Sequence, residues 1–409
     1  MIGIRAVTYH LPHKFLLEHI TSLAPAIMAW EQCLFPVRTS RVNLPPIAAP
    51  IENSKMQRIA SACYQVAARW FNVPVDPHLS EDKGQKLLFS HAFSILNDFP
   101  HAFVHIIAVK NNEINCDILA HSAQLIQNVS AISHNGADNF RLGISANVLP
   151  DGPFFPFTMS SGDYSFSIAL ELTQEINRLL LSKDVAKLTF PLLKKHIIAH
   201  LRPQIAKIND MAEAIAQKCG LTFKGFDFSL APIIEEHGSV LPILNAIGLT
   251  YLGASGSMFA TAFLTDLLKS FGQYFKMVGF SGVMYSVLED LELCTCNNNN
   301  GVSIEQLTAV STMCGCGVDM VPVYGGITVE ELFAVFLDIT AISCRLKKPL
   351  GIRILPIPRT HNHQEHYTLF SDDADFISNT KIVPVNNSYN IQNKNKNNNN
   401  IIKINYPNE

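Results

Sequence analysis

The sequence has little charge and no excess of positive charge. Charged residues make up 16% of the 409 positions, and the formal net charge is -3. Without a basic surplus, we expect neither nucleic acid nor an anionic membrane surface as a partner. The opening residues, MIGIRAVTYHLPHK, also lack the long apolar run and the small-residue cleavage site of a signal peptide. We therefore expect a cytoplasmic protein.

A membrane span and a disulfide framework are not expected either. The uncharged stretch from Gly238 to Thr265 is long enough to cross a bilayer. However, it contains clustered proline and glycine, so a strand, a glycine loop and a helix of a buried α/β core explain it better. The cysteines number nine, an odd count, which predicts free thiols in a reducing compartment.

The common metal and nucleotide motifs are missing. Zinc sites favour the CxxC spacing, whereas the paired cysteines here have the CxC spacing. The group His361, His363 and His366 is interpreted as solvated loop histidines. A P-loop lysine and a GxGxxG motif are absent from the sequence. The sequence therefore predicts no metal site and leaves the cofactor unknown.

Strand and helix patterns alternate along the remaining chain. Short apolar segments such as GIRAVTYHL and GVDMVPV predict strands, and apolar residues spaced by three and four predict helices between them. Residues 163–181 are among the predicted helices. The alternation predicts a parallel α/β architecture in one domain over residues 1–385. Two asparagine-rich segments are exceptions, read as a loop insertion near residues 293–301 and a disordered tail over residues 386–409.

Polar residues near the strand ends are the first candidates for a site. In parallel α/β folds, ligands bind beyond the carboxyl ends of the strands. Asp227 lies in the strand GFDFSLAP, and Glu289 follows the strand KMVGFSGVM. Asp319 lies inside GVDMVPV, where a buried carboxylate needs a partner, and Arg353 in LGIRILPIP is the natural one. This ion pair is either structural or ligand-binding.

Two loops are further candidates for ligand binding. One is a glycine-rich loop before a helix, whose backbone amides could bind an anion; the alternative is a tight turn with a serine N-cap. Its candidate residues are Gly253, Ser255, Gly256 and Ser257. The other loop, GPFFPFTMSSGD, contains Ser161, which either caps a helix or belongs to a loop that closes over a pocket.

The stretch MCGCGVDMVP joins a double cysteine to Asp319. Gly315 is expected to end a helix in the left-handed conformation, and Gly317 to open the strand that holds Asp319. Cys314 would then lie at the negative end of a helix dipole, which disfavours a thiolate. It is a candidate nucleophile only if its pKa is lowered.

Six separated motifs together give a family resemblance. They are, in order, GPFFPF with SSGDYSFSIALEL, GFDFSLAPI, YLGASGSMFATAFLTDLLK, VGFSGVMYSVLED, STMCGCGVDMVPVYGGITVEEL and KKPLGIRILPIP. With them the chain resembles the uncharacterised family called domain of unknown function 711, over about residues 2–375. That family's fold is similar to the barrel of pyruvate formate-lyase and anaerobic ribonucleotide reductase. The resemblance thus implies a barrel of largely parallel strands with surrounding helices.

The resemblance also bears on the cysteines. The family pattern Cys-Gly-x-Gly-aliphatic-Asp falls on Cys314, Gly315, Gly317, Val318 and Asp319, so the cysteine at the variable position is the weaker candidate. The radical enzymes of this fold need a glycine flanked by arginine and tyrosine near the C-terminus. The corresponding part of this sequence has no such motif. Glycyl-radical chemistry is therefore not expected, and fold similarity alone does not carry function across.

Three hypotheses follow. The first is an enzyme with a pocket at the barrel mouth for a small anionic metabolite, with Asp227, Glu289 and Asp319 as acid, base or metal ligand and Arg353 binding the anion. The second is a non-catalytic binding or regulatory protein for a small molecule. The third is a scaffold in which the polar residues form internal ion pairs. A homodimer is compatible with a barrel of this size and low charge.

Overall fold

The computed structural model describes the chain except residues 183, 359–367, 369, 371–375, 387–400 and 404–409. Its strands are β1 (Gly3–His10), β2 (Ser40–Asn43), β3 (Trp70–Val75), β4 (Ala102–Lys110), β5 (Glu113–Asn115), β6 (Leu142–Ala146), β7 (Ser165–Glu171), β8 (Thr222–Asp227), β9 (Gly317–Tyr324), β10 (Leu350–Ile357) and β11 (Ile401–Lys403). Its α-helices are α1 (Leu17–Thr21), α2 (Ala24–Glu31), α3 (Asn53–Gln65), α4 (Asp82–Asp98), α5 (Cys116–Ser130), α6 (Leu172–Leu180), α7 (Phe190–Cys219), α8 (Leu241–Ala246), α9 (Ser257–Lys269), α10 (Leu291–Asn300), α11 (Ile304–Ser311) and α12 (Val329–Leu346).

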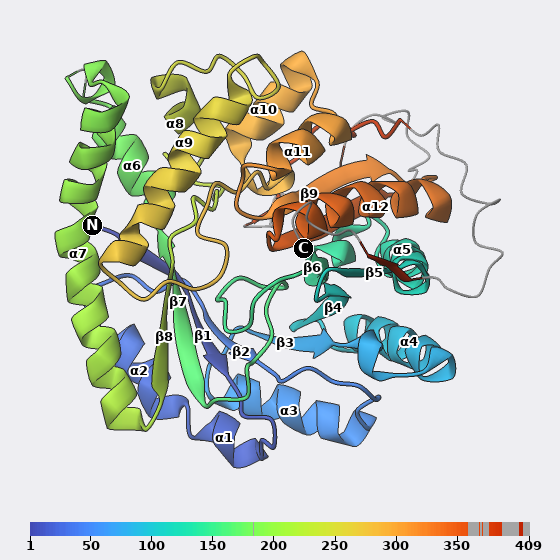
Figure 1. The fold of residues 1–409 in the computed structure, drawn as a ribbon. Helices are drawn as coiled ribbons and strands as arrows, with labels where there is room; N and C mark the ends of the chain where they lie inside the picture. The colour runs from blue at the N-terminus through green and yellow to red at the C-terminus, as the bar shows by residue number, and fades with distance from the viewer. Residues whose placement is uncertain (183, 359–367, 369, 371–375, 387–400, 404–409) are drawn as a thin grey trace.

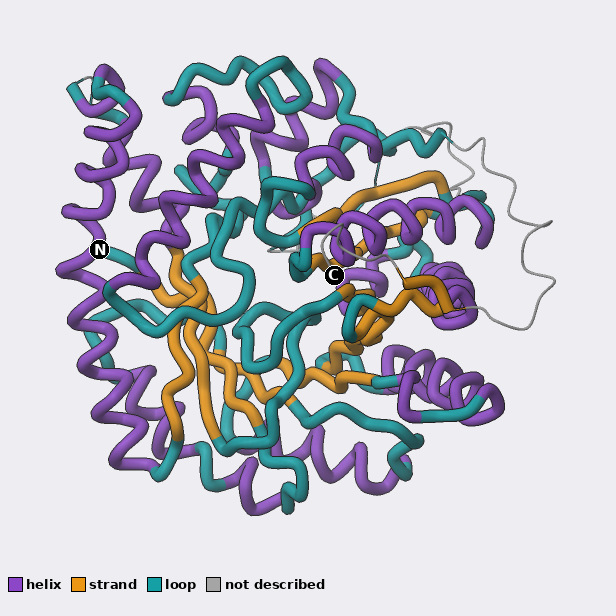
Figure 2. Tube along the Cα trace, viewed as in Figure 1, coloured by secondary structure: helices purple, strands orange, loops and turns teal. Residues whose placement is uncertain are grey.

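The strands form one mixed sheet in the order β8-β7-β1-β2-β3-β4-β6-β10-β9, with β5 and β11 attached to β4. The middle strands β1, β2, β3, β4 and β6 are parallel, since crossover segments connect them. The flanking pairs β7–β8 and β9–β10 are each parallel internally and antiparallel to the middle group. Strands lie in the middle of the molecule and helices around it (Figures 1 and 2). The fold is thus α/β with a mostly parallel sheet and surrounding helices.

One irregular segment, residues 277–286, lies between the two edge strands of the sheet. It contacts the end of β8 and the beginning of β9 through isolated bridges, all of them parallel. The bridges join Phe226 to Met277, Leu230 to Val283, and Ser286 to Asp319. The segment therefore connects the two edges β8 and β9.

The middle strands have two different faces. In β1, Val7 and Tyr9 pack into the main hydrophobic core against the helices. Thr8 and His10 alternate with them and point to the opposite side, as period-two strand geometry requires. We call this opposite side the inner face; in β4 it carries His105.

A loop, residues 151–163, covers part of the inner face. The carbonyl oxygen of Thr158 accepts hydrogen bonds from His105 Nδ1 at 2.8 Å and from Asn72 Nδ2 at 2.9 Å. The hydroxyl of Thr8 donates to the carbonyl of Pro153 at 2.8 Å. Buried polar groups on three strands are satisfied in this way by loop backbone. The loop that the sequence marked as rigid is therefore held inside the molecule.

The structure corrects the helix predicted over residues 163–181. Residues Ser165–Glu171 form β7, which pairs with β1, and only Leu172–Leu180 form the helix α6. Six consecutive buried residues in β7 face cores on both sides. A strand buried on both faces has no alternating pattern, so its sequence cannot be distinguished from a buried helix by periodicity.

The asparagine-rich segments are also corrected in part. The expected loop insertion at residues 293–301 is largely the helix α10, which Asp290 caps by accepting from the Leu293 amide at 3.0 Å. Asn297 is buried and donates to the carbonyl of Lys381 at 2.7 Å, so the run is anchored in the fold. Most of the predicted tail lies outside the described residues, but β11 within it pairs with β5.

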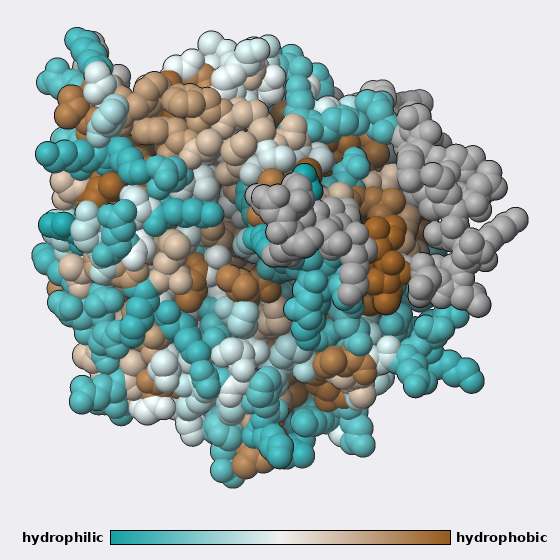
Figure 3. Space-filling model, in the orientation of Figure 1, coloured by the Kyte–Doolittle hydropathy of each residue, from teal (hydrophilic) through white to brown (hydrophobic). Residues whose placement is uncertain are grey.

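The surface is mixed, with one apolar area. Figure 3 shows hydrophobic side chains gathered over α9, and Phe259 there is 58% exposed. Phe190 at the start of α7 contacts Phe259, with ring centroids 5.2 Å apart. Among the described residues, no helix is both long and apolar enough to span a bilayer.

The buried His105 predicts a loss of stability in acid. In the neutral form of His105, Nδ1–H donates to the Thr158 carbonyl and Nε2 accepts from Ser145. Burial lowers the pKa of His105 from 6.5 to about 4, and the hydrogen bond to Thr158, which raises the pKa, offsets this only in part. The unfolded chain therefore binds this proton at higher pH than the folded chain. The stabilisation is present above pH 6.5 and lost as the pH falls to about 4, by about 3 kcal/mol.

Urea unfolding at a series of pH values measures this loss. We expect the free energy of unfolding to fall less steeply between pH 7 and pH 4 in His105→Gln than in the wild type. Equal slopes in the two proteins would contradict the assignment, because the carboxylates are shared by both.

Candidate functional site

A cavity of about 420 Å³ lies on the inner face of the sheet. That volume is typical of small-molecule sites. The lining residues are Arg5, Arg38, Thr39, Arg41, Arg69, Trp70, Phe103, Phe140, Phe154, Phe155, Phe157, Ala231, Pro232, Ile233, Ile234, Glu235, Met284, Ser286, Glu289, Cys316, Asp319, Arg353 and Phe376. From the middle strands, the lining residues lie at the amino ends rather than at the carboxyl ends where the sequence predicted a site.

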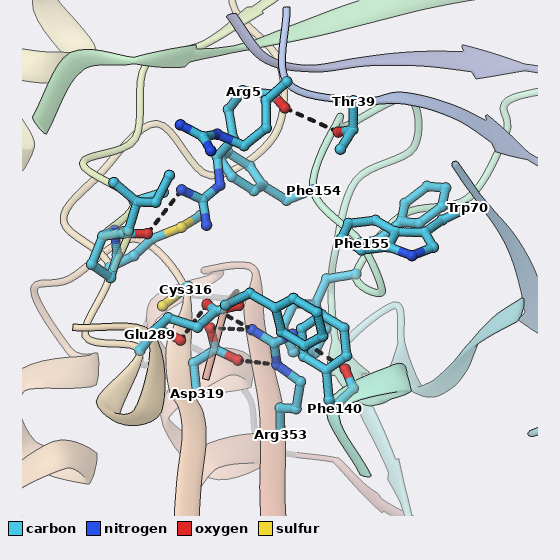
Figure 4. A pocket seen from close by; sticks show the side chains of 18 of the residues that line it. Arg5, Thr39, Trp70, Phe140, Phe154, Phe155, Glu289, Cys316, Asp319 and Arg353 are labelled. Carbon is cyan, nitrogen blue, oxygen red and sulfur yellow. Dashed lines mark hydrogen bonds and ion pairs between the residues drawn. The ribbon is translucent and has the colours of Figure 1, made fainter. Parts of the chain in front are cut away.

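One end of the cavity holds Arg353 between two carboxylates, and we call it the acidic end. Arg353 Nε and Nη2 bind Asp319 Oδ1 and Oδ2 at 2.7 and 2.9 Å, a bidentate pair between neighbouring strands. Arg353 Nη2 also contacts Glu289 Oε2 at 3.2 Å, and Ser286 donates to the same oxygen at 2.5 Å. Figure 4 shows these side chains converging. The predicted Asp319–Arg353 pair is present.

The charge state of the acidic end follows from these contacts. Burial alone would lower the pKa of Arg353, but Asp319 and Glu289 raise it above its ordinary value. The guanidinium is therefore charged, and it also lies over the ring of Phe140 at 5.3 Å. Two carboxylates face one arginine, so the acidic end carries a surplus of one negative charge when both are ionised.

The other end of the cavity contains Arg5 and Arg41, and we call it the basic end. Arg5 Nη1 donates to the carbonyl of Pro232 at 2.8 Å, and Arg41 Nε donates to the hydroxyl of Thr39 at 2.9 Å. Arg41 is 6% exposed. In the part of the chain that the structure describes, neither arginine forms an ion pair with a carboxylate. Figure 4 shows Arg5 across the cavity from Arg353.

The arginines at the rim of the cavity are more exposed than Arg41, and their contacts differ from those of the two ends. Arg38 there contacts Glu171 at 2.7 Å and Glu235 at 2.9 Å. Arg69 is exposed and lies over the ring of Trp70 at 4.6 Å. The wall between the two ends is aromatic. It includes Phe154, Phe155 and Phe157 of the loop 151–163, which we call the inserted loop. The cavity therefore combines a large apolar wall with a few convergent charges.

The two neighbouring cysteines, Cys314 and Cys316, lie in different surroundings. Cys316 lines the cavity, whereas the Cys314 side chain is fully buried and accepts from the Gly317 amide at 3.4 Å. A hydrogen bond with Cys316 lowers the pKa of Cys314 to about 6, although burial opposes this. The same hydrogen bond and burial raise the pKa of Cys316 well above its usual range. Of the two interacting thiols, only Cys316 lines the cavity.

The expected helix end at Gly315 is wrong. Helix α11 ends at Ser311, so Cys314 lies beyond it, and the expected dipole effect is replaced by hydrogen bonds. Gly315 instead packs against Gly282, where a Cβ on Gly315 would lie 2.9 Å from backbone. Gly317 has a φ of 100°, which favours glycine, and does begin the strand β9.

The other predicted residues lie elsewhere. Asp227 is fully buried and accepts from the amides of Ser229, Phe280 and Ser281 at 2.8, 2.7 and 3.0 Å, which ties β8 to the segment 277–286. The loop of Gly253, Ser255, Gly256 and Ser257 precedes α9, and the Ser257 hydroxyl accepts from the Gly253 amide at 3.0 Å, as in a closed turn. The Ser161 amide donates to Asp151 at 2.8 Å. None of these residues lines the cavity in the described structure.

A metal centre is not visible among the described residues, which contain no group of three or more potential ligands. The histidine group at residues 361–366 lies outside the described part of the chain. The sequence did not predict Arg5 and Arg41 as site residues, because they lie near the amino ends of their strands. The available signal was an arginine inside each of two strand segments, GIRAVTYH and SRVN, because arginine is seldom buried without a partner.

Comparison with known proteins shows similarity to one family over most of the chain. A family model described as "Uncharacterised ACR (DUF711)" matches residues 30–366. "UPF0210" proteins of Pyrobaculum aerophilum and Pyrobaculum arsenaticum are 27% and 28% identical over 69% and 60% of the chain, which covers 62% and 54% of them. One of Methanosarcina acetivorans is 24% identical over 87% of the chain and 82% of its own length. The chain thus spans less than two thirds of the first two relatives.

The acidic end predicts a large effect of removing its arginine. Replacing Arg353 by Met leaves Asp319 and Glu289 without their counter-charge, so we expect the free energy of unfolding to fall by about 3–5 kcal/mol in urea denaturation. Lys276→Met is the control, because it breaks an exposed pair with Glu213 and should change stability by less than about 1 kcal/mol. Equal effects in the two variants would refute a buried ion pair.

Proposed function

The chain belongs to the family described as Uncharacterised ACR (DUF711), and we propose that it is an enzyme acting on a small anionic metabolite in this cavity. Family membership names no reaction, so the support comes from the side chains of the cavity. The volume, the aromatic wall and the charged groups at two ends all favour a small ligand held in one orientation.

The observation that carries the proposal is the buried, unpaired guanidinium of Arg41. Burial lowers the pKa of Arg41 to about 9, and the positive charge of Arg5 contributes to this shift. The group is still charged at neutral pH, yet its surroundings disfavour the charge. A buried charge without a partner is costly, and it is found mostly where a ligand supplies the partner. A carboxylate or phosphate between Arg5 and Arg41 would fill that role.

The acidic end supports a proton-transfer step. Asp319 is held in a bidentate pair and fixes Arg353, so we assign it a positioning role. Glu289 has one oxygen engaged by Ser286 and Arg353 and lines the cavity, which leaves it as the candidate general acid or base. The role of Cys314 as a nucleophile is not used in this proposal, because its sulfur lies outside the cavity wall.

The barrel remains part of the proposal. The parallel bridges of residues 277–286 to both edge strands support a closed arrangement in which the cavity lies inside a barrel. Two groups of parallel strands running in opposite directions are consistent with the resemblance to the pyruvate formate-lyase barrel. The homodimer also stays a proposal.

The variant Arg41→Met tests the anion site. Without ligand, we expect it to raise the free energy of unfolding by about 1 kcal/mol, because a buried unpaired charge is removed. Inorganic phosphate and 3-phenylpropionate should raise the melting temperature of the wild type but not of this variant. The controls are Arg58→Met, at an exposed arginine of α3, and Cys314→Ala; neither residue lines the cavity, so both variants should keep the ligand response. An unchanged response in Arg41→Met would exclude the proposed anion site.

The enzymatic part is tested with the compounds that stabilise the wild type. A metabolite library is screened by thermal shift, and each stabilising compound is incubated with the protein and followed by mass spectrometry. We expect conversion by the wild type and a fall in kcat of about 10²- to 10⁴-fold in Glu289→Gln. Binding without any conversion would favour the non-catalytic binding protein instead.

A further inference from the structure

The cavity has two ends of opposite charge. This asymmetry indicates a second charged group on the ligand in addition to its anionic group. The basic end has two arginines without a carboxylate partner in the described structure. The acidic end has Asp319 and Glu289 sharing Arg353. Figure 4 shows the two ends facing each other across the same space.

The two ends belong to one cavity. Arg41 and Glu289 both line its volume of about 420 Å³. They nevertheless form no direct ion pair. A gap between opposite charges inside one cavity is suited to a ligand that carries both charges a short distance apart.

We infer that the ligand is a small zwitterion of the amino-acid class, with its carboxylate between Arg5 and Arg41 and its ammonium group at Glu289. This inference rests on the proposed anion site and adds the opposite charge. With such a ligand bound, the ammonium group compensates the surplus negative charge of the acidic end, and the carboxylate reduces the positive charge of the basic end from two to one.

The wall between the ends indicates an apolar body for this ligand. Phe103, Phe154 and Phe155 line the cavity, and Figure 4 shows Phe154 beside Arg5 and Phe155 beside Trp70. Arg41 itself lies over the Phe155 ring at 5.4 Å. An aromatic or branched side chain would gain from contact with these rings, whereas a short polar body would leave them facing water.

A proton on Glu289 or Asp319 is the competing way to compensate the acidic end. In that case the ligand needs an anionic group alone, and an ammonium group brings no gain. The two possibilities differ in one measurable quantity, which is the effect of the ligand's amino group on affinity in the presence and absence of the Glu289 charge.

Three compounds that share a phenylethyl group measure that effect. L-phenylalanine carries both charges, 3-phenylpropionate lacks the ammonium, and 2-phenylethylamine lacks the carboxylate. Their affinities for the full-length protein are measured by isothermal titration calorimetry at millimolar concentrations. The proteins are the wild type, Glu289→Gln, Arg41→Gln and, as a control at an exposed arginine outside the cavity, Arg58→Gln.

We expect the wild type to bind L-phenylalanine at least about tenfold more tightly than 3-phenylpropionate. In Glu289→Gln this preference should disappear, while 3-phenylpropionate binds as before or better. Arg41→Gln should weaken both carboxylates by about tenfold or more and leave 2-phenylethylamine unaffected. Arg58→Gln should leave all three affinities unchanged.

The outcomes separate the inference from the proposed function. If 3-phenylpropionate binds in an Arg41-dependent manner but the amino group adds nothing, the zwitterion inference is overturned and the anion site stands. If L-phenylalanine does not bind at all, the inference is overturned as well. If no carboxylate or phosphate binds in an Arg41-dependent manner, both fail. A melting curve of each variant identifies any that is unfolded, and Glu289→Ala, which also removes the negative charge, then replaces Glu289→Gln as the test of the amino-group preference.

Discussion

Polar groups removed from water need partners, and this constraint acts most strongly on the inner face of the sheet. Asn72 and His105 find theirs in the backbone of the loop 151–163. Asp319 finds its partner in Arg353 on the neighbouring strand. The position of the loop, the pairing of the charges and the shape of the cavity all follow from satisfying these groups. Arg41 is the conspicuous case in which the described residues supply no counter-charge.

The inserted loop depends in turn on close packing that only glycine allows. A Cβ on Gly351 would lie 2.7 Å from the ring of Phe157, and one on Gly143 would lie 2.8 Å from it. The ring therefore rests directly on two strand backbones, β6 and β10, that pair with each other. Because the loop is fixed there, its phenylalanines form a wall of the cavity rather than a mobile lid. The rigidity of the site is a consequence of core packing.

Several features could be predicted from the sequence, and the reasons are local. The alternation of strands and helices identified the α/β class, and a buried aspartate in GVDMVPV implied a cationic partner, found in Arg353. The motif order pointed to the family that the matching model shows. The strand β7 was missed because it is buried on both faces, and the helix α10 because asparagine-rich composition concealed its anchoring contacts. Local patterns report what a segment prefers, and neighbours override that preference.

By itself the sequence determined the class of fold, the family and the chemistry of one ion pair, because periodicity, motif order and the cost of a buried charge are all legible along the chain. Only the tertiary structure decided which charged groups share a space. Arg5, Arg41, Glu289 and Arg353 come from segments far apart in the chain, and their meeting depends on sheet order and on the inserted loop. It also decided between the cysteines, since Cys316 faces the cavity and Cys314 the core. Spacing in sequence does not fix the direction in which a side chain points, because that direction is set by the packing of the whole domain.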